Sequence, residues 1–474
     1  MIFSSLSFLL LFFPILTILY FTIPAKYDVI RKYVLLGFSV LFYASGEPVY
    51  IFLIFGCILG TWVLSKGIEK REIFSYVVAI TLNLLPLFVF KYLNFFVNNL
   101  TLITKDVKVD LVQLSLPIGI SFYTFQILAY VIDLYHGRVE RQNNILFLAL
   151  YIMFFPQLIA GPIVRYQEVK DSIENDRTDW DKVRYGVGRF IKGLSKKVLI
   201  ANQVGFISSE IMMNPLNSIS TGLLWLAVLA YTLQIYFDFS GYSDMAIGLG
   251  SIFGFVFPEN FKRPYMSTSI SDFWRRWHIT LGSFFRDYVY IPLGGNRVKP
   301  IKWIFNVFTV WILTGLWHGA AWNFAIWGGY YAVLLVLEKG SSVLLKRFNL
   351  QVHPFIGWLL TMFFILLGWG IFMADGYCMS DLLAFIYRLF HSEILENRVT
   401  LVSMNLISYL PYVVLGVFIS FPTGTAVNWM RKSLDRKKSK TVAVLHDFML
   451  IFMLLLCIVY IVGGSYNPFI YYRF

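Results

Sequence analysis

The residues best suited to chemistry lie between Tyr236 and Trp322, where polar and ionisable side chains interrupt a strongly apolar sequence. Two histidines, His278 and His318, stand there among tryptophans. Three acids precede or flank them: Asp238, Asp244 and Asp272. Ionisable groups at membrane depth are costly and usually persist because they have a function. A neutral imidazole can act as a base toward a hydroxyl, so we place the candidate active site in this stretch.

The elements that must position these residues are those of an all-α, polytopic membrane protein. Of 474 residues, 58% are hydrophobic and only 14% are charged, which is too apolar for an ordinary soluble protein. Uncharged runs of about 20 residues recur along the chain, and they predict about 10 to 13 membrane-embedded helices. The first run, Leu6 to Ile23, lacks a basic flank and a cleavage site, so we expect a retained span and no signal peptide.

The basic net charge of +13 does not predict a nucleic-acid partner. Lysines and arginines are dispersed in short connections, as in cytoplasmic loops, so the expected surroundings are membrane lipid. The chain contains none of the spacings HExxH, CxxC or GxGxxG. Its three cysteines are far apart, which predicts neither a disulfide framework nor a metal site: Cys57, Cys378 and Cys457.

The density of basic residues orients the connections. The polar segment Arg165 to Lys197 is expected on the cytoplasmic surface as short amphipathic helices, with Trp180 and Phe190 as interfacial anchors. Alternation along the later spans places the C-terminal tail outside.

The apolar run Trp303 to Leu337 is predicted to enter the membrane and return. Lys299 and Lys302 precede it and Lys339 follows it, which places both ends on the cytoplasmic side. Its 35 residues fall short of two spans of about 20 each. We therefore expect a partial-depth or strongly tilted helical hairpin with His318 inside the membrane. Its break is expected at one of the glycines Gly315, Gly319, or Gly328 to Gly329.

Several motifs resemble the membrane-bound O-acyltransferase (MBOAT) superfamily over nearly the whole chain. They include LPIGISFYTFQ from Leu116, FFPQLIAGPI from Phe154, FSGYSDMAIGLG, PENF, FWRRWHITL, RDYVYIPLGGNR and LTGLWHGAAWNF. The last five are similar to the bacterial branch that O-acetylates alginate, peptidoglycan and other exported polysaccharides. The branch that D-alanylates teichoic acids is less similar at IPLGGNR.

The resemblance implies one membrane-embedded domain over residues 1–474, whose helices surround a central funnel. Residues 1–110 would form N-terminal helices, 111–345 the catalytic core, and 346–474 C-terminal helices and an extracytoplasmic tail. The implied activity is that of an acetyltransferase in the inner or plasma membrane of a bacterium, with cytoplasmic acetyl-CoA as acyl donor, no tightly bound cofactor and a glycan acceptor outside. The implied partner is an extracytoplasmic SGNH-hydrolase-like transferase.

The resemblance also assigns the two histidines. The superfamily's invariant catalytic histidine corresponds to His318 in the WHG triplet, and its second functional position, an Asn or a His, corresponds to His278. Transfer from a thioester to a hydroxyl needs a base, and His318 is the expected one. For His278, a catalytic role and a structural role near the membrane interface both stay open.

Four residues near the histidines are supporting candidates: Asp244, Trp317, Arg275 and Arg276. The two arginines either mark the cytoplasmic side or attract the phosphates of coenzyme A. Asp238 and Asp244 are six positions apart and do not share a helical face well, so either is equally a partner for an arginine. The remaining histidines are expected at the surface: His136, His353, His391 and His446.

The tail SYNPFIYYRF holds a candidate acyl relay. Its Phe469-x-Tyr471-x-x-Phe474 spacing resembles the C-terminal motif of a small membrane subunit of the teichoic acid D-alanylation system, in which a terminal tyrosine is thought to carry the acyl group. The resemblance implies that Tyr471 accepts acetyl near His318. An aromatic belt at the membrane interface explains the same residues.

Other functions fit the same pattern. The cargo is alternatively D-alanine or another acyl group. Interrupted helices and buried charges also occur in transporters, so export of an acylated substrate without chemistry is a further alternative, as is a scaffold for cell-wall assembly with dispensable histidines.

Overall fold

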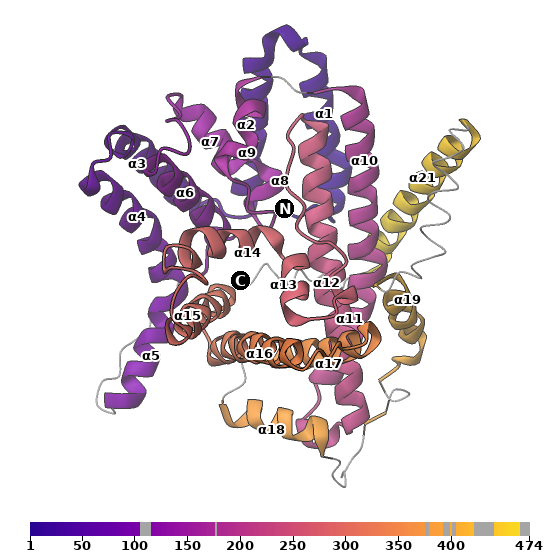
Figure 1. The fold of residues 1–474 in the computed structure, drawn as a ribbon. Helices are drawn as coiled ribbons and strands as arrows, with labels where there is room; N and C mark the ends of the chain where they lie inside the picture. Colours follow the sequence, from indigo (N-terminus) through magenta and orange to yellow (C-terminus); the bar gives the residue numbers. More distant parts are fainter. Residues whose placement is uncertain are drawn as a thin grey trace.

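The computed structural model describes residues 1–104, 115–175, 178–374, 379–391, 399–400, 404–420 and 440–464, and every regular element in these ranges is a helix (Figure 1). The N-terminal helices are α1 (Phe13–Thr22), α2 (Asp28–Ala44), α3 (Ile51–Glu69), α4 (Ile73–Leu87) and α5 (Leu93–Thr104). The central helices are α6 (Ile120–Tyr135), α7 (Ile145–Met153), α8 (Phe155–Leu158), α9 (Tyr166–Glu174), α10 (Trp180–Ser195), α11 (Asn202–Met212), α12 (Thr221–Ile252), α13 (Ile270–Arg276), α14 (Ile279–Phe285), α15 (Pro300–His318) and α16 (Trp322–Arg347). The last are α17 (Pro354–Met373), α18 (Met379–Phe390), α19 (Leu410–Ser420) and α21 (Lys440–Gly463).

Six of the described helices are long and apolar enough to cross a membrane: Ile51–Glu69, Ile73–Thr101, Thr221–Ile252, Pro300–His318, Pro354–Met373 and Val444–Gly463. The pair Phe8–Thr22 and Ala25–Ala44, bent by 106°, gives a seventh candidate. These helices and the absence of strands from the described ranges confirm an all-α, polytopic membrane protein. The sequence-based figure of about 10 to 13 is larger because it also counts apolar runs that form helices too short to span.

Helix α12 is the central axis of the fold (Figure 1). It has 32 residues and is buried on nearly every side from Thr232 to Ile252, although this stretch includes the ionisable residues Asp238 and Asp244. Ser220 caps its start, since the Ser220 hydroxyl accepts a hydrogen bond from the Leu223 amide at 3.4 Å. Helices α10, α11 and α17 pack against it.

Glycines bring α10 unusually close to α12. A Cβ at Gly186 would lie 2.5 Å from the carbonyl oxygen of Gly248, and one at Gly193 would lie 2.5 Å from that of Gly241. Gly186 and Gly193 are seven residues apart on α10, and Gly241 and Gly248 are seven residues apart on α12. The two glycines of each helix therefore lie on one face of it. Small residues at such a contact let the two backbones approach within membranes as well.

This contact corrects one prediction about α10. Trp180 is 75% exposed at the start of the helix, but Phe190 is only 5% exposed. The Phe190 ring packs 6.2 Å from that of Phe8 and 5.9 Å from that of Phe13. The expectation that Phe190 anchors a surface helix was wrong, because α12 and the N-terminal helix cover the apolar face of α10.

The predicted run forms a helical hairpin, α15 and α16, in which α15 by itself is long and apolar enough to cross a membrane. The chain turns at Gly319, which has extended backbone (φ −167°). Gly315 and Gly328 lie within the two helices, where a Cβ would come 2.1 Å from the carbonyl oxygen of Phe324 and 2.2 Å from that of Trp311. Of the glycines considered, Gly319 is therefore the break, and Gly315 and Gly328 allow the two helices to touch.

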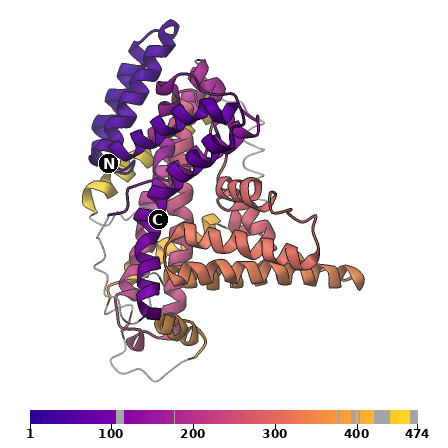
Figure 2. The same ribbon diagram turned by 90° about the vertical axis from the view of Figure 1, so that its left-hand side faces the viewer.

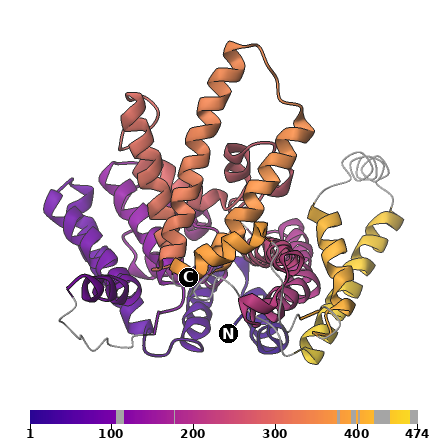
Figure 3. The same ribbon diagram turned by 90° about the horizontal axis from the view of Figure 1, so that it is seen from below.

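The hairpin and α17 run across the direction of α12. Figures 2 and 3 show these helices, coloured coral to orange, side by side and steeply inclined to the central axis. Helices that cross steeply cannot all stand along one membrane normal, so one of the two sets is strongly tilted.

Candidate active site

A pocket of about 570 Å³ lies where α13, α14 and the hairpin α15–α16 meet. Both histidines of interest, His278 and His318, line it. Four tryptophans contribute to its walls: Trp274, Trp277, Trp303 and Trp311. Its lining also includes exposed cationic side chains, which mark its rim: Arg275, Arg286 and Lys339. Apolar walls with a few convergent polar groups are typical of small-molecule sites.

His318 occupies the last position of α15 and is 3% exposed. Its ring packs edge-on against Trp317 at 5.0 Å, Trp327 at 5.3 Å and Phe372 at 5.1 Å. Three aromatic neighbours leave the imidazole little freedom to rotate, so the orientation of the candidate base is set by packing.

The π-helical segment Phe88–Tyr92 holds the end of α15 that carries His318. Lys91 Nζ donates a hydrogen bond to the carbonyl of Trp317 and another, at 3.1 Å, to the hydroxyl of Ser121. The Tyr92 hydroxyl donates to the carbonyl of Leu316 at 2.9 Å. Carbonyls in the last turn of a helix have no partner within it and carry partial negative charge, so a lysine is well placed to satisfy one.

His278 stands between α13 and α14, outside the candidate spans, and is 2% exposed. Its backbone is left-handed (φ 45°), a conformation in which histidine is commoner than most residues. Its ring lies edge-on to Phe239 at 4.6 Å and to Trp317 at 5.8 Å. Burial lowers the pKa of His278 to about 3, so this imidazole is neutral at physiological pH.

Trp317 connects the two histidines. Its ring lies 5.8 Å from that of His278 and 5.0 Å from that of His318. It is not part of the pocket lining, so it acts as a packed spacer behind the site. The fold therefore brings together two histidines 40 positions apart in the chain.

Asn260, in the PENF motif, is a site residue that sequence reasoning missed. It is fully buried, and its side-chain oxygen lies 3.1 Å from His278 Nδ1. The motif was recognised, but nothing in its spacing relates it to a histidine 18 positions later. The link exists only in the folded chain.

Glu338 is a second missed residue. Its carboxylate accepts hydrogen bonds from the backbone amides of Ile270 at 2.6 Å and Ser271 at 3.2 Å. These amides begin α13, where negative charge is favourable. Glu338 thus ties α16 to the helix that leads into His278.

Asp244 belongs to an ion cluster and does not line the pocket. Its carboxylate lies 2.6 Å from Arg189 Nη2 and 2.6 Å from Lys196 Nζ. The same arginine binds Glu259 at 2.7 Å, the residue before Asn260. Asp244 is therefore linked to the PENF segment through Arg189, which binds both Asp244 and Glu259. Asp238 forms a separate buried ion pair with Lys197 at 2.7 Å.

The two arginines that precede His278, Arg275 and Arg276, differ in their surroundings. Arg275 is exposed, lines the pocket and forms no ion pair with a described residue, whereas Arg276 pairs with Asp272 at 3.0 Å and does not line the pocket. Of the two, only Arg275 is placed to meet a ligand. The relay candidate Tyr471 lies outside the described residues.

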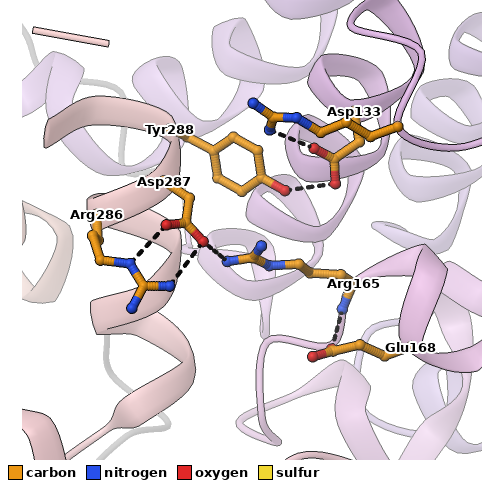
Figure 4. Close-up of polar contacts among 7 residues, drawn as sticks. Asp133, Arg165, Glu168, Arg286, Asp287 and Tyr288 are labelled. Carbon is orange, nitrogen blue, oxygen red and sulfur yellow. Dashed lines mark hydrogen bonds and ion pairs between the residues drawn. The ribbon is translucent and has the colours of Figure 1, made fainter. Parts of the chain in front are cut away.

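A polar cluster supports the segment Arg286–Tyr290 at the rim (Figure 4). Asp287 accepts hydrogen bonds from Arg286 Nε at 2.7 Å and from Arg165 Nη2 at 2.6 Å. Burial alone would raise the pKa of Asp287, but these two guanidinium groups hold it below its usual value. The labelled members are Asp133, Arg165, Glu168, Arg286, Asp287 and Tyr288. The loop before α9 thereby positions one arginine of the rim.

The geometry suits general base chemistry. Two imidazoles lie at one aromatic pocket, and the described ranges contain no group of three or more His, Cys, Asp or Glu side chains that could hold a metal ion. Low exposure favours the neutral, proton-accepting form of an imidazole. The cationic rim favours a ligand that carries negative charge.

Comparisons with known proteins identify the family of this chain. The model of the membrane-bound O-acyltransferase family (MBOAT) matches residues 137–381, more than half of the chain and every residue of the pocket. Probable alginate O-acetylase AlgI of Pseudomonas syringae pv. tomato is 39% identical over 387 residues, covering 79% of this chain and 73% of the relative. The peptidoglycan O-acetyltransferase of Helicobacter pylori is 36% identical over 410 residues, covering 79% and 77%.

A more distant relative is the teichoic acid D-alanyltransferase of Bacillus subtilis, 33% identical over 236 residues, which cover 46% of this chain and 58% of the relative. The chain belongs to the membrane-bound O-acyltransferase family. It is a multi-pass membrane enzyme that transfers acyl groups to oxygen, as the resemblance implied.

Proposed function

We propose that this enzyme takes acetyl from cytoplasmic acetyl-CoA and moves it across a bacterial cell membrane for O-acetylation of a cell-wall or exported polysaccharide. The observation that carries the proposal is the presence of His278 and His318 on one aromatic pocket with a cationic rim. The relatives that cover most of this chain are named as acetylating enzymes of alginate and peptidoglycan, which favours acetyl as the cargo.

In the proposed reaction, His318 accepts the proton of an acceptor hydroxyl. The hydroxyl oxygen forms a bond to the thioester carbonyl carbon, and the carbon–sulfur bond breaks. The proton held by His318 passes to the departing thiolate, so free coenzyme A and an O-acetyl ester result. A positioned base contributes roughly 10² to 10⁴-fold to such a step.

The rim supports a phosphorylated donor. Arg275, Arg286 and Lys339 carry positive charge at the pocket, and guanidinium groups match phosphate geometry well. The aromatic walls below suit the uncharged arm that would carry the thioester. A donor of this shape places its anionic end outward and its reacting carbonyl near the histidines.

The acceptor side is proposed to involve a partner. The expected partner is an extracytoplasmic SGNH-hydrolase-like transferase that passes acetyl to the glycan. Tyr471 is the proposed relay between His318 and that partner. If Tyr471 carries acetyl, a Tyr471→Phe variant loses glycan acetylation in cells, whereas full acetylation in that variant contradicts the relay.

Transfer of D-alanine is the second candidate. The relative named for that activity matches less than half of this chain, so acetyl is favoured. Competition between labelled acetyl and D-alanyl donors in isolated membranes decides between them.

The proposal is tested in cells that lack the enzyme and are complemented with variants. Ester-linked acetate on isolated surface polysaccharide is released by mild base and counted. His318→Ala is expected to reduce it to background, whereas His136→Ala, which removes an exposed histidine that does not line the pocket, retains it. Equal acetate in cells with and without the enzyme would contradict the proposal.

A further inference from the structure

The side-chain amide of Asn260 is oriented by its neighbours. Its oxygen accepts hydrogen bonds from the Thr280 backbone amide at 3.2 Å and from the Thr280 hydroxyl at 3.0 Å. Its nitrogen donates to the Ser243 hydroxyl at 3.2 Å. A backbone N–H can only donate, so the amide oxygen, and not the nitrogen, faces Thr280 and also His278 Nδ1.

This orientation determines the tautomer of His278. A carbonyl oxygen cannot donate a hydrogen bond, so the contact of 3.1 Å between Asn260 and His278 Nδ1 requires a hydrogen on Nδ1. In the neutral ring, the lone pair is then on Nε2. That nitrogen is buried, and no described group forms a hydrogen bond with it.

The backbone of Asn260 holds the same turn. Its carbonyl accepts a hydrogen bond from the Ile279 amide at 3.0 Å. Side chain and main chain of one asparagine thus fix three consecutive residues, of which the first, His278, has left-handed backbone. The ring is held in direction as well as in tautomer.

We propose that Asn260 is a positioning residue that fixes His278 in the Nδ1–H tautomer, so that Nε2 is the basic nitrogen this histidine offers to the acyl-transfer site. The inference rests on the proposed function in that His278 is taken to act in the transfer. The tautomer itself follows from the contacts of Asn260 alone. A neutral amide is the appropriate partner, since a carboxylate would favour the imidazolium form.

The charges around His278 leave Asn260 as its one direct polar partner among the described residues. His318, at the end of α15, lines the same pocket as His278. Arg275 and Arg276 stand on α13. On α12, the acids are paired with other cations, Asp238 with Lys197 and Asp244 with Arg189 and Lys196. Lys91 contacts the Trp317 carbonyl, and its Nζ lies 5.7 Å from the centroid of the Trp317 ring.

The tautomer is measured directly by nitrogen NMR of the full-length protein in nanodiscs with ¹⁵N-labelled histidine. The His278 signals are assigned by their loss in His278→Gln. We expect protonated Nδ1 and unprotonated Nε2 throughout the pH range in which the protein stays folded. A protonated Nε2 overturns the inference. Because this readout needs no turnover, it stands even if no acetyl transfer is found.

The pH profile tests the consequence for activity. Asn260→Asp keeps the acceptor oxygen but places a carboxylate beside Nδ1, which favours imidazolium. The acid limb of the kcat/KM profile is expected to move up by about one pH unit or more. If the acid limb of the kcat/KM profile stays in place in a folded Asn260→Asp protein, the positioning role of Asn260 is contradicted.

Two controls separate this effect from a general defect. In His278→Gln, adding Asn260→Asp is expected to shift nothing further, since the group that titrates is gone. Asn306→Asp alters another fully buried asparagine, whose amide binds the carbonyls of Leu293 and Gly295, and is expected to leave the limb in place. A shift in either control counts against Asn260 acting through His278.

Discussion

At the scale of single residues, the site depends on two buried imidazoles, while cationic side chains stay at the rim. His278 is the better defined of the two, because its partner Asn260 is identified. Lys91 is satisfied by a carbonyl at the end of α15 and a hydroxyl. Buried imidazoles and outward cations suit a site that takes protons from a hydroxyl and binds an anionic donor.

The buried neutral form of His278 predicts a pH dependence of stability. Its pKa falls from the usual 6.5 to about 3 on folding, so the unfolded chain binds more protons between these values. Stability contributed by the neutral ring is therefore complete above about pH 6.5 and falls by about 1.4 kcal/mol per pH unit below it. Thermal unfolding at about pH 7.5 and pH 5 should show a smaller decrease in His278→Gln than in the wild type, and equal decreases would contradict this account.

The exposed Arg275 predicts an effect on donor binding and not on the chemical step. Arg275→Gln should raise the KM for acetyl-CoA about two- to fivefold with little change in kcat, since exposed charge pairs contribute roughly 0.2 to 1 kcal/mol. The effect should shrink at high salt. Arg276→Gln is the matched control, because its neighbour Asp272 and not the pocket holds that side chain. An equal change in both variants would argue against a donor site at this rim.

Sequence reasoning placed His278, His318 and Arg275 at one site, and all three line the pocket. Their residue types were unusual for their apolar surroundings, so they were visible without a structure. Asn260, Glu338 and Lys91 were not, because each acts through a hydrogen bond to a partner distant in the chain. Trp317 was named as a neighbour of His318, yet its position between both histidines required the fold.

At the scale of elements, the close glycine-mediated contact between α10 and α12 is central to the fold. The hairpin α15–α16 was predictable because basic residues flank one apolar run at both ends. Such a pattern places both ends on the same side of the membrane, so the chain must turn back between them. The packing of α10 was not, since its amphipathic pattern suits a membrane surface equally well. The glycines that decide the matter have no side chain from which hydrophobic periodicity could be read.

This contact predicts a large cost for a small substitution. In Gly193→Ala, the new Cβ would lie 2.5 Å from the Gly241 carbonyl oxygen and 2.7 Å from the Met245 amide nitrogen. Both are backbone atoms that cannot turn aside, so we expect destabilisation of about 2 kcal/mol or more. Gly222→Ala is the control, since no atom lies within 4 Å of its added Cβ. Detergent-solubilised thermal unfolding measures the difference, and equal midpoints would refute the close contact.

At the scale of the whole molecule, an apolar exterior surrounds a buried axis, α12, and a hairpin crosses that axis to bring His318 beside His278. Composition was sufficient to predict the all-α membrane class. Composition could not predict that the hairpin crosses α12, because hydropathy records how apolar a segment is and not the direction in which its helix runs. The two histidines come from both kinds of element: His318 ends the long helix α15, and His278 lies between the short helices α13 and α14.

The central claim is that His318 performs acyl transfer at this pocket. The most direct measurement is release of coenzyme A and formation of labelled ester by membranes that contain the enzyme together with its extracytoplasmic partner, with labelled acetyl-CoA and extracted surface polysaccharide. Binding of acetyl-CoA is measured in parallel. The account predicts that His318→Ala binds acetyl-CoA with unchanged affinity but transfers acetyl about 10² to 10⁴-fold more slowly. Transfer at the wild-type rate by a folded His318→Ala enzyme would contradict it.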